Sequence, residues 1–179
     1  ECIRQAVRTG MAIDAPINGY FRNNGAMSNQ NFGVVIDVRN NAPHALAIAN
    51  NTFGSVRTRA IDYVSGVHAG DASAGHLTIT GNSCSATAIG ADRCAFITPT
   101  QSSTLCTNVR QNTFTANVAA IGMFVTAPAT MRIESSGTDC GGVCASATAH
   151  LDARNTLMPG ASATGVTLAA PGTCTLPTL

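Results

Sequence analysis

The chain has 179 residues and a formal net charge of +1 at pH 7, and all ten of its basic residues are arginine. This length suits one domain that can fold alone by burying roughly 70% of its unfolded surface. The near-neutral charge argues against a nucleic-acid-binding protein and against attachment to membranes through a basic patch. Aromatic residues are only 4% of the chain, and the abundant Ala, Gly, Thr, Ser and Asn favour closely stacked backbone over a bulky helical core.

The first predicted element is a short helix at Glu1–Thr9, which has apolar residues on one side and Gly10 as a stop signal. It is too short to be stable without a packing surface, so residues 1–9 are interpreted as an N-terminal cap helix or partial coil. Because the chain starts at Glu1 without a signal-like segment, we expect a mature product or an excised piece. No apolar run approaches the roughly 18 residues that span a membrane, so we expect no membrane span.

From residue 10 to residue 125, short β-branched segments separated by Asn, Gly, Ser and Pro predict strands, most clearly at 34–38, 76–80, 95–98 and 121–125. One pattern recurs between them: an apolar residue, two variable residues, Asn, a small residue and a second apolar residue. The spacing of its asparagines is 27, 31 and 30 residues, and residues 154–157 keep only the end of the pattern. The asparagines are Asn24, Asn51, Asn82 and Asn112.

A second pattern alternates with the first and repeats an isoleucine at spacings of 23, 25, 28 and 32 residues. Two interleaved motifs with one drifting period indicate a repeated unit with constant strands and variable loops. The isoleucines are Ile13, Ile36, Ile61, Ile89 and Ile121.

This strand–Asn–strand repeat resembles the right-handed parallel β-helix family, a class of solenoids. The resemblance covers residues 10–124 well and residues 126–173 loosely, and it rests on the repeat rather than on a catalytic signature. It implies an all-β fold: a single right-handed parallel β-helix of about five to six coils over residues 1–179. Regular coils would occupy 10–125, and an irregular coil with a C-terminal cap would occupy 126–179.

In such a solenoid, successive coils lie about 4.8 Å apart and equivalent residues stack on one another. We therefore expect the five isoleucines to form one interior row, and Phe53, Cys84 and Phe114 to form another. The four asparagines fit the bends between strands, because Asn tolerates a left-handed backbone and its amide can bond to the next coil as a ladder.

The seven cysteines predict disulfide-stapled loops, and therefore a secreted, periplasmic or cell-surface protein, with free buried cysteines as the alternative. Cys94 and Cys106 flank a polar run that a bridge would staple, and Cys140–Cys144 is the second plausible bridge. The odd count leaves at least one thiol free or paired with another chain, and Cys2 and Cys174, near the two ends, are candidates for joining copies. No cysteine spacing matches a zinc site.

Three aspartates each follow one of the stacking isoleucines and could form an acidic row on consecutive coils; they are Asp14, Asp37 and Asp62. Neighbouring carboxylates bind calcium or act as acid and base in glycoside hydrolysis. The simpler interpretation is that each carboxylate is solvated or caps a turn, since water and salt screen an exposed row of like charges. The row also stops at Gly90 and Gly122.

The four histidines are scattered, without the spacing of a metal-binding pair. They are His44, His68, His76 and His150. Two acid–histidine neighbourhoods, Asp62–Tyr63 with His68 and Asp71 with His76, fall in one turn-rich stretch, where a cleft would be expected.

Carbohydrate-active members of the β-helix family carry, in their hydrolase branch, adjacent Asp residues, Gly-His-Gly and Arg-x-Lys. This chain has no adjacent Asp pair and no Lys, and Gly75-His76-Leu77 fills the His motif only in part. A flat threonine array of the ice-binding kind is not supported either, since only Thr78-x-Thr80 and Thr98-x-Thr100 match near the repeats. No phosphate loop, dinucleotide fingerprint or nucleophile elbow is present. We therefore assign no catalytic, cofactor-binding or metal-binding residue and favour a protein that is not an enzyme.

The expected function is that of an extracellular structural or adhesive β-solenoid. Open solenoid ends expose unpaired strand edges, so we expect self-association end to end, into a surface filament. The alternative is a carbohydrate-binding or carbohydrate-cleaving β-helix that acts on a surface polysaccharide. A third interpretation is an excised portion of a larger passenger. Neither nucleic acid nor a cofactor is expected as a partner.

Overall fold

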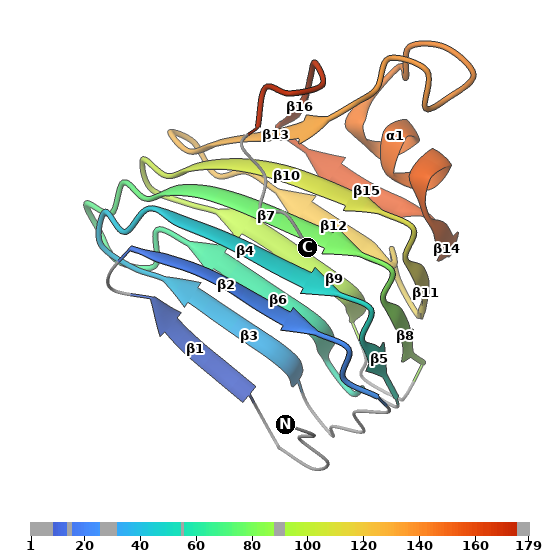
Figure 1. Cartoon of the computed structure of the whole chain (residues 1–179), viewed down its shortest axis with the longest axis horizontal. Helices are drawn as coiled ribbons and strands as arrows, with labels where there is room; N and C mark the ends of the chain where they lie inside the picture. Colours follow the sequence, from blue (N-terminus) through green and yellow to red (C-terminus); the bar gives the residue numbers. More distant parts are fainter. Residues whose placement is uncertain (1–8, 14–15, 26–31, 55, 88–91, 175–179) are drawn as a thin grey trace.

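The computed structural model describes residues 9–13, 16–25, 32–54, 56–87 and 92–174, with the backbone alone at 9–13. The predicted helix at Glu1–Thr9 lies outside these residues, except that Thr9 begins the first strand. Short strands stack in parallel into three sheets around one interior (Figure 1). The chain is an all-β parallel β-solenoid, as the repeat predicted.

Each complete turn of the chain passes through sheet A, then sheet B, then the shorter sheet C. Sheet A consists of β1 (Thr9–Ile13), β3 (Phe32–Val38), β6 (Arg59–Ser65), β9 (Arg93–Pro99), β12 (Ile121–Phe124) and β15 (Ala161–Thr164). Sheet B consists of β2 (Ile17–Arg22), β4 (His44–Ala49), β7 (Ala74–Thr80), β10 (Thr104–Arg110), β13 (Thr130–Glu134) and β16 (Val166–Ala169). Sheet C consists of β5 (Thr52–Phe53), β8 (Ser83–Ala86), β11 (Thr113–Ala116) and β14 (Thr156–Met158).

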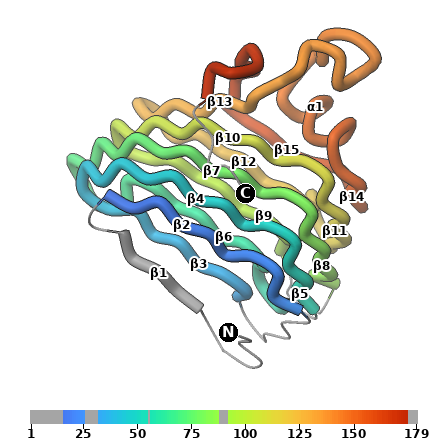
Figure 2. Tube along the Cα trace, viewed as in Figure 1, coloured from blue at the N-terminus to red at the C-terminus, as the bar shows by residue number. Residues whose placement is uncertain are grey.

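The solenoid has about four turns, fewer than the five to six coils predicted. Within the described residues, the first and last turns contribute strands to sheets A and B alone, whereas the turns between them also supply a strand to sheet C. The tube view shows successive turns stacked along one axis (Figure 2). The repeat count in the sequence therefore included two incomplete turns.

A ladder of asparagine side chains runs along the corner between sheets B and C. The Nδ2 of each asparagine except the last donates to the Oδ1 of its counterpart in the next turn at 2.9 or 3.0 Å. The same Oδ1 accepts from the backbone N–H of the preceding asparagine at 3.0 or 3.1 Å. The members are Asn24, Asn51, Asn82, Asn112 and Asn155. The ladder is confirmed, and Asn155 extends it by one turn.

The left-handed residue of each bend precedes the ladder asparagine, so the predicted left-handed conformation of the ladder residues themselves is wrong. Asn23, Asn50 and Gln111 have φ values of 58°, 55° and 58°, and Gly81 has 65°. A Cβ at Gly81 would lie 2.2 Å from Oδ1 of Asn50, so a larger residue there would require the Asn50 side chain to move. The bend therefore uses one residue to reverse the backbone and the next to bond the turns together.

The interior row predicted in sheet C is confirmed. Phe53, Cys84 and Phe114 occupy equivalent positions on neighbouring strands, and Leu157 continues the row. These side chains form one hydrophobic core with the inward residues of sheets A and B.

The isoleucine row predicted in sheet A is confirmed only for Ile61 and Ile121, which are both aligned with Ala95, and it is wrong for Ile13 and Ile36. Ile61 is aligned with Val34, and Ile36 is aligned with Tyr63, two positions further along the strand. Ile13 is aligned with Val38, and Ile89 lies outside the described residues. Because every second residue of these strands is apolar, the hydrophobic pattern alone does not distinguish alignments that differ by two residues.

The disulfides agree with the sequence expectation only in part. Cys140–Cys144 is confirmed, but Cys94 pairs with Cys84, and Cys106 pairs with Cys174. The predicted Cys94–Cys106 bridge is wrong because Cys94 lies in the hydrophobic core, whereas Cys106 lies on the outer face of sheet B between the inward Leu105 and Thr107. Cys174 is thus bonded within the chain rather than kept for a second copy, and Cys2 lies outside the described residues.

One end of the stack is covered by α1 (Ala147–Arg154), which lies beside β14 and β15 (Figure 1). Leu151 of α1 is fully buried in the core. Two edge amides of β15 donate to this helix: Ala161 to Oδ1 of Asp152 at 2.7 Å, and Ala163 to Oγ1 of Thr148 at 3.2 Å. The helix therefore occupies part of the free edge of sheet A. No helix within the described residues has the length and apolar character needed to cross a membrane.

A histidine and a tyrosine are buried together inside the solenoid. Nδ1 of His44 donates to the carbonyl of Ala42 at 3.1 Å, and its Nε2 accepts from the hydroxyl of Tyr63. Gly75 leaves room for the imidazole, since a Cβ there would lie 2.2 Å from Nε2 of His44. Burial lowers the pKa of His44 and raises the pKa of Tyr63. Both groups are therefore neutral at pH 7 and form a packed polar pair.

We expect Asn82→Ala to lower the free energy of unfolding by about 2–4 kcal/mol, because buried donors and acceptors in two turns lose their partners. Asn82 bonds to Asn51, Asn112 and the carbonyl of Ile48. Urea unfolding followed by circular dichroism measures the change. The exposed Thr113→Ala is the control, with an expected change below about 0.5 kcal/mol. Equal losses in the two variants would contradict a stabilising role for the ladder.

Candidate functional site

The predicted acidic row is not formed. Asp37 and Asp62 are out of register by two positions, so each is aligned with a valine of the other strand. Asp62 accepts from Nη1 of Arg59 at 2.9 Å on the outer face of sheet A, and Asp14 lies outside the described residues. The two described carboxylates are therefore not directly opposite one another on the neighbouring strands.

The outer face of sheet A carries a charge-balanced network. Asp92 accepts from Nε of Arg59 at 3.0 Å and from Nε of Arg93 at 2.9 Å. The guanidinium of Arg59 lies 3.8 Å above the ring of Phe96. With Asp62, the two arginines and two aspartates offset one another, so this network joins neighbouring turns rather than attracting a charged ligand.

Neither acid–histidine neighbourhood expected from the sequence forms an acid–imidazole pair. Asp71 accepts from the backbone N–H of His68 at 2.8 Å and thereby caps a turn. His76 lies on the outer face of sheet B, and its Nδ1 is buried without a hydrogen-bond partner. The stretch between Asp62 and His76 thus contains no catalytic acid–histidine pair. His76 is its one residue that remains a candidate for a functional site.

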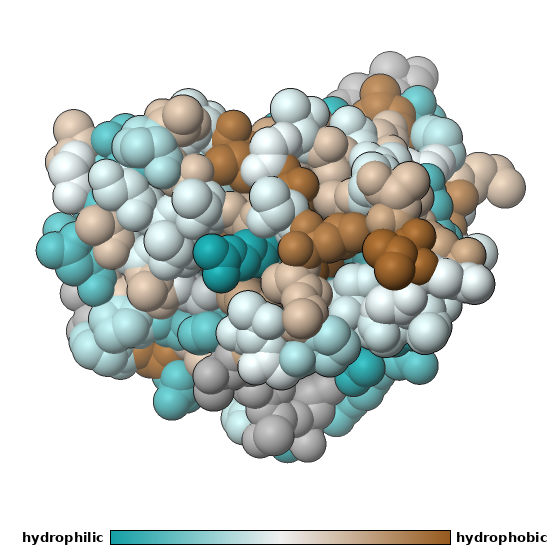
Figure 3. Space-filling view, turned by 90° about the horizontal axis from the view of Figure 1, so that it is seen from above, coloured by the Kyte–Doolittle hydropathy of each residue, from teal (hydrophilic) through white to brown (hydrophobic). Residues whose placement is uncertain are grey.

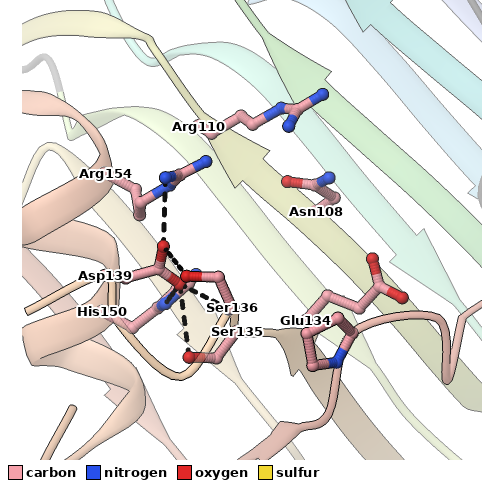
Figure 4. Close-up of a pocket in the computed structure, with 9 residues that line it drawn as sticks. Asn108, Arg110, Glu134, Ser135, Ser136, Asp139, His150 and Arg154 are labelled. Carbon is pink, nitrogen blue, oxygen red and sulfur yellow. Dashed lines mark hydrogen bonds and ion pairs between the residues drawn. The ribbon is translucent and has the colours of Figure 1, made fainter. Parts of the chain in front are cut away.

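A polar pocket of about 160 Å³ lies where β10, β13, α1 and the C-terminal segment meet (Figure 4). It contains an acid–histidine pair that the sequence did not indicate. Its lining residues are Asn108, Arg110, Glu134, Ser135, Ser136, Asp139, His150, Arg154 and Pro171.

The position of α1 follows from its two ends. Ser146 caps the helix, with its Oγ accepting from the N–H of Ala149 at 3.2 Å. At the other end, Asn155 bonds to the carbonyl of Val109 at 3.1 Å as the last member of the ladder. His150 and Arg154 are one helical turn apart and lie on the same face. The ladder therefore places both side chains beside the end of β10.

Asp139 ties the loop after β13 to this helix. Its Oδ2 accepts from the N–H of Ser136 at 2.8 Å and lies 3.1 Å from Nδ1 of His150. Its Oδ1 accepts from Oγ of Ser136 at 2.5 Å and from Nη1 of Arg154 at 3.0 Å. Burial would raise the pKa of Asp139, but the Ser136 hydrogen bonds, Arg154 and His150 together hold this pKa below its ordinary value. Asp139 is therefore an ionised, fully engaged carboxylate.

His150 is a neutral side chain at pH 7. Burial lowers its pKa, and the charge of Arg154 adds to this effect, while Asp139 opposes it. Oγ of Ser136 bonds to Asp139 rather than to the imidazole. No hydroxyl among the described residues hydrogen-bonds to His150, so the pocket lacks the serine–histidine contact of nucleophilic catalysis.

The open part of the pocket carries donors and acceptors side by side. Nε of Arg110 is buried without a hydrogen-bond partner. Asn108 lies between Arg110 and Glu134 (Figure 4). Glu134 uses Oε1 to accept from the N–H of Cys174 at 3.1 Å. The pocket thus offers a charged donor, an amide and a partly engaged carboxylate within one small space.

A second pocket, of about 260 Å³, lies further back along β10 on the same face of sheet B. His76, Cys106 and Arg132 occupy equivalent positions on β7, β10 and β13 and line it together with threonine and small side chains. The two pockets are separated along β10 by the step from Cys106 to Asn108.

Sequence reasoning named His150 but did not find the residues that lie around it in the pocket. Those residues come from separate parts of the chain: β10, a disulfide loop and a helix. One signal could have found Arg154: it precedes Asn155 as Gln111 precedes Asn112. Arg154 therefore occupies the same bend position as Gln111 and lies beside the end of β10. There the N–H of Gln111 donates to the carbonyl oxygen of Arg154 at 2.6 Å.

No family model matches the chain, and neither a curated protein nor a solved structure matches it.

We expect His150→Gln to weaken the loss of stability on acidification. The folded-state pKa of His150 is lowered, so below about pH 6.5 the unfolded state binds the proton first and stability falls toward the folded-state pKa. Urea unfolding of the wild type and the variant at pH values from about 7 down to about 5 measures this slope. His44, whose pKa is also lowered, contributes equally in both proteins. The exposed His68→Gln is the control, and parallel curves for wild type and His150→Gln would contradict the assignment.

Proposed function

We propose that the chain is an extracellular adhesive β-solenoid that binds a carboxylate-bearing surface polysaccharide in the pocket between β10, β13 and α1. The observation that carries this proposal is Arg110, which lines this polar pocket and whose buried Nε has no hydrogen-bond acceptor from the protein. A buried donor without a partner is costly, and a carboxylate is the acceptor whose geometry fits a guanidinium best.

The other pocket residues suit the remainder of a sugar. The amide of Asn108 can both donate and accept, and Glu134 retains an oxygen that accepts from a hydroxyl. Such mixed polar groups orient a ligand rich in hydroxyls more readily than one that is purely apolar. A uronate residue combines the required carboxylate with neighbouring hydroxyls.

Binding is favoured over cleavage. Sugar hydrolysis needs one carboxyl group that can donate a proton and a second that acts as base or nucleophile. Asp139 is ionised and engaged by Ser136, His150 and Arg154, so it neither holds a proton nor faces a substrate freely. This supports a scaffold that holds a polysaccharide.

The proposed extracellular location is supported by disulfide bonding of the six described cysteines. Such bonds persist in secreted and surface proteins and are rare in reducing compartments. A disulfide-pinned solenoid also suits adhesion, since its outer faces present long, rigid surfaces.

We expect Arg110→Gln to weaken binding of tri-galacturonic acid by about 10-fold or more, the loss typical of a hydrogen bond to a charged group. Isothermal titration calorimetry with the full chain measures the affinity. The matched control is the exposed Arg57→Gln, which should bind as the wild type does. The methyl-esterified trimer, which lacks the carboxylates, should bind more weakly to the wild type. The proposal is falsified if the wild type does not bind the trimer, or if Arg110→Gln binds it equally well.

End-to-end assembly is the second candidate function. Within the described residues, sheets A and B run to both ends of the stack. Hydrophobic residues gather near the middle of the surface seen from above in Figure 3, bordered by hydrophilic ones. At the C-terminal end, however, Thr148 and Asp152 of α1 already accept from the edge amides of β15. Assembly through this end would use the remaining edges of β14 and β16.

We expect Thr148→Val combined with Asp152→Ala to increase self-association, because two β15 amides lose their acceptors and become free to pair with another strand. Sedimentation velocity over a range of concentrations measures the change, and Asp71→Asn, far from this edge, is the control. A wild type that remains one monomeric species at all concentrations would remove the filament proposal. A double variant that also remains monomeric would contradict the protective role of α1.

A further inference from the structure

The Cys106–Cys174 disulfide lies at a charged position on the outer face of sheet B. Cys106 is partly exposed and lines the 260 Å³ pocket, with His76 aligned on one side and Arg132 on the other. Nδ1 of His76 is buried there without a hydrogen-bond partner, and Arg132 is exposed. Cys106 therefore lines a surface pocket, in register with an exposed arginine on the neighbouring strand.

The other two disulfides are placed differently. Cys84 and Cys94 are 6% and 0% exposed within the core, out of reach of a solute. Cys140–Cys144 closes a short loop that directly follows the carboxylate of Asp139, and it joins residues only four apart. Opening that bridge would loosen its own loop without freeing a segment from sheet B.

The Cys106–Cys174 bridge holds the segment that follows β16 against sheet B. The N–H of Cys174 donates to Glu134, and Pro171 forms part of the wall of the proposed saccharide pocket. A turn in which Thr173 bonds to the carbonyl of Ala170 keeps this segment compact. The bridge thus lies in one pocket and fixes the wall of the other.

We propose that Cys106 is a site of thiol–disulfide exchange with an external acidic thiol, and that this exchange releases the wall of the saccharide pocket. The incoming thiolate attacks Sγ of Cys106, a new S–S bond forms, and the Cys106–Cys174 bond breaks with Cys174 leaving as the thiolate. A second thiolate then attacks the mixed disulfide and releases the Cys106 thiolate. Two external thiols are oxidised to one disulfide, and the protein disulfide is reduced to two thiols.

The residues around Cys106 supply the selectivity. The attacking species is an anion, so the Arg132 charge attracts it and lowers the energy of the thiolate at the sulfur. On the other side of Cys106, His76 occupies the equivalent position on β7, and its Nδ1 has no hydrogen-bond partner. An acidic thiol, which carries further negative charge, benefits more from Arg132 than a cationic thiol does.

The exchange is tested on the full chain with glutathione as the acidic thiol and cysteamine as the cationic one. After quenching with an alkylating reagent, peptide mass spectrometry identifies which cysteines have opened. We expect Cys106 and Cys174 to open before Cys84 and Cys94. We expect Arg132→Gln to reduce the ratio of glutathione to cysteamine rates several-fold at Cys106, whereas the exposed Arg57→Gln leaves the ratio unchanged. Earlier opening of Cys84–Cys94, or a rate ratio that does not depend on Arg132, would overturn the exchange site.

The effect on the saccharide pocket rests on the proposed function and has its own test. Cys106→Ser with Cys174→Ser should change the affinity for tri-galacturonic acid several-fold, whereas Cys140→Ser with Cys144→Ser should change it less. If the wild type binds the trimer and the first double variant binds it identically, release of the wall is refuted. If the wild type does not bind the trimer, the proposed function fails, while the exchange measurement still decides the redox site.

Discussion

The amide ladder between sheets B and C is the interaction on which the alignment of the turns depends. Parallel strands with apolar residues at every second position tolerate a shift of two residues, because the same face stays buried after the shift. Each ladder asparagine instead bonds to both the backbone and the side chain of the asparagine before it. A shifted turn would leave these buried groups unpaired. The ladder therefore selects one alignment among several that satisfy the hydrophobic pattern.

This division of roles explains what could be predicted from the sequence. The asparagines were recognisable because a buried amide ladder requires the same residue in each turn, and Phe53, Cys84 and Phe114 followed at a constant offset. The isoleucine row held only in part, because Val34 is aligned with Ile61 and Tyr63 with Ile36. The predicted Cys94–Cys106 bridge was wrong for a related reason. Spacing along the chain does not reveal that Cys94 enters the core while Cys106 faces outward.

The candidate site was only partly accessible to sequence reasoning, because it lies where the repeat is interrupted. A helix replaces the bend between β13 and β14, and it returns to the repeat at Asn155. Asp139 and His150 meet across this insertion, and no other pair of this kind occurs among the described residues of the other turns. Repetition constrains residues that occur in every turn, and it says nothing about residues that occur once. The binding groups of a solenoid are therefore the hardest part to read from its period.

The contacts that hold the pocket differ in what their loss would do. The ladder contact at Asn155 also sets the alignment of the last turns. Losing this contact would therefore disturb the fold as well as the pocket. The carboxylate of Asp139 is buried and charged, so breaking its contacts leaves a buried charge unpaired. The bridge at Cys106 differs from both, because it lies on the outer face and fixes a segment that follows the last strand. Of these three constraints, it is the one whose removal alters the pocket while leaving the stacked turns aligned.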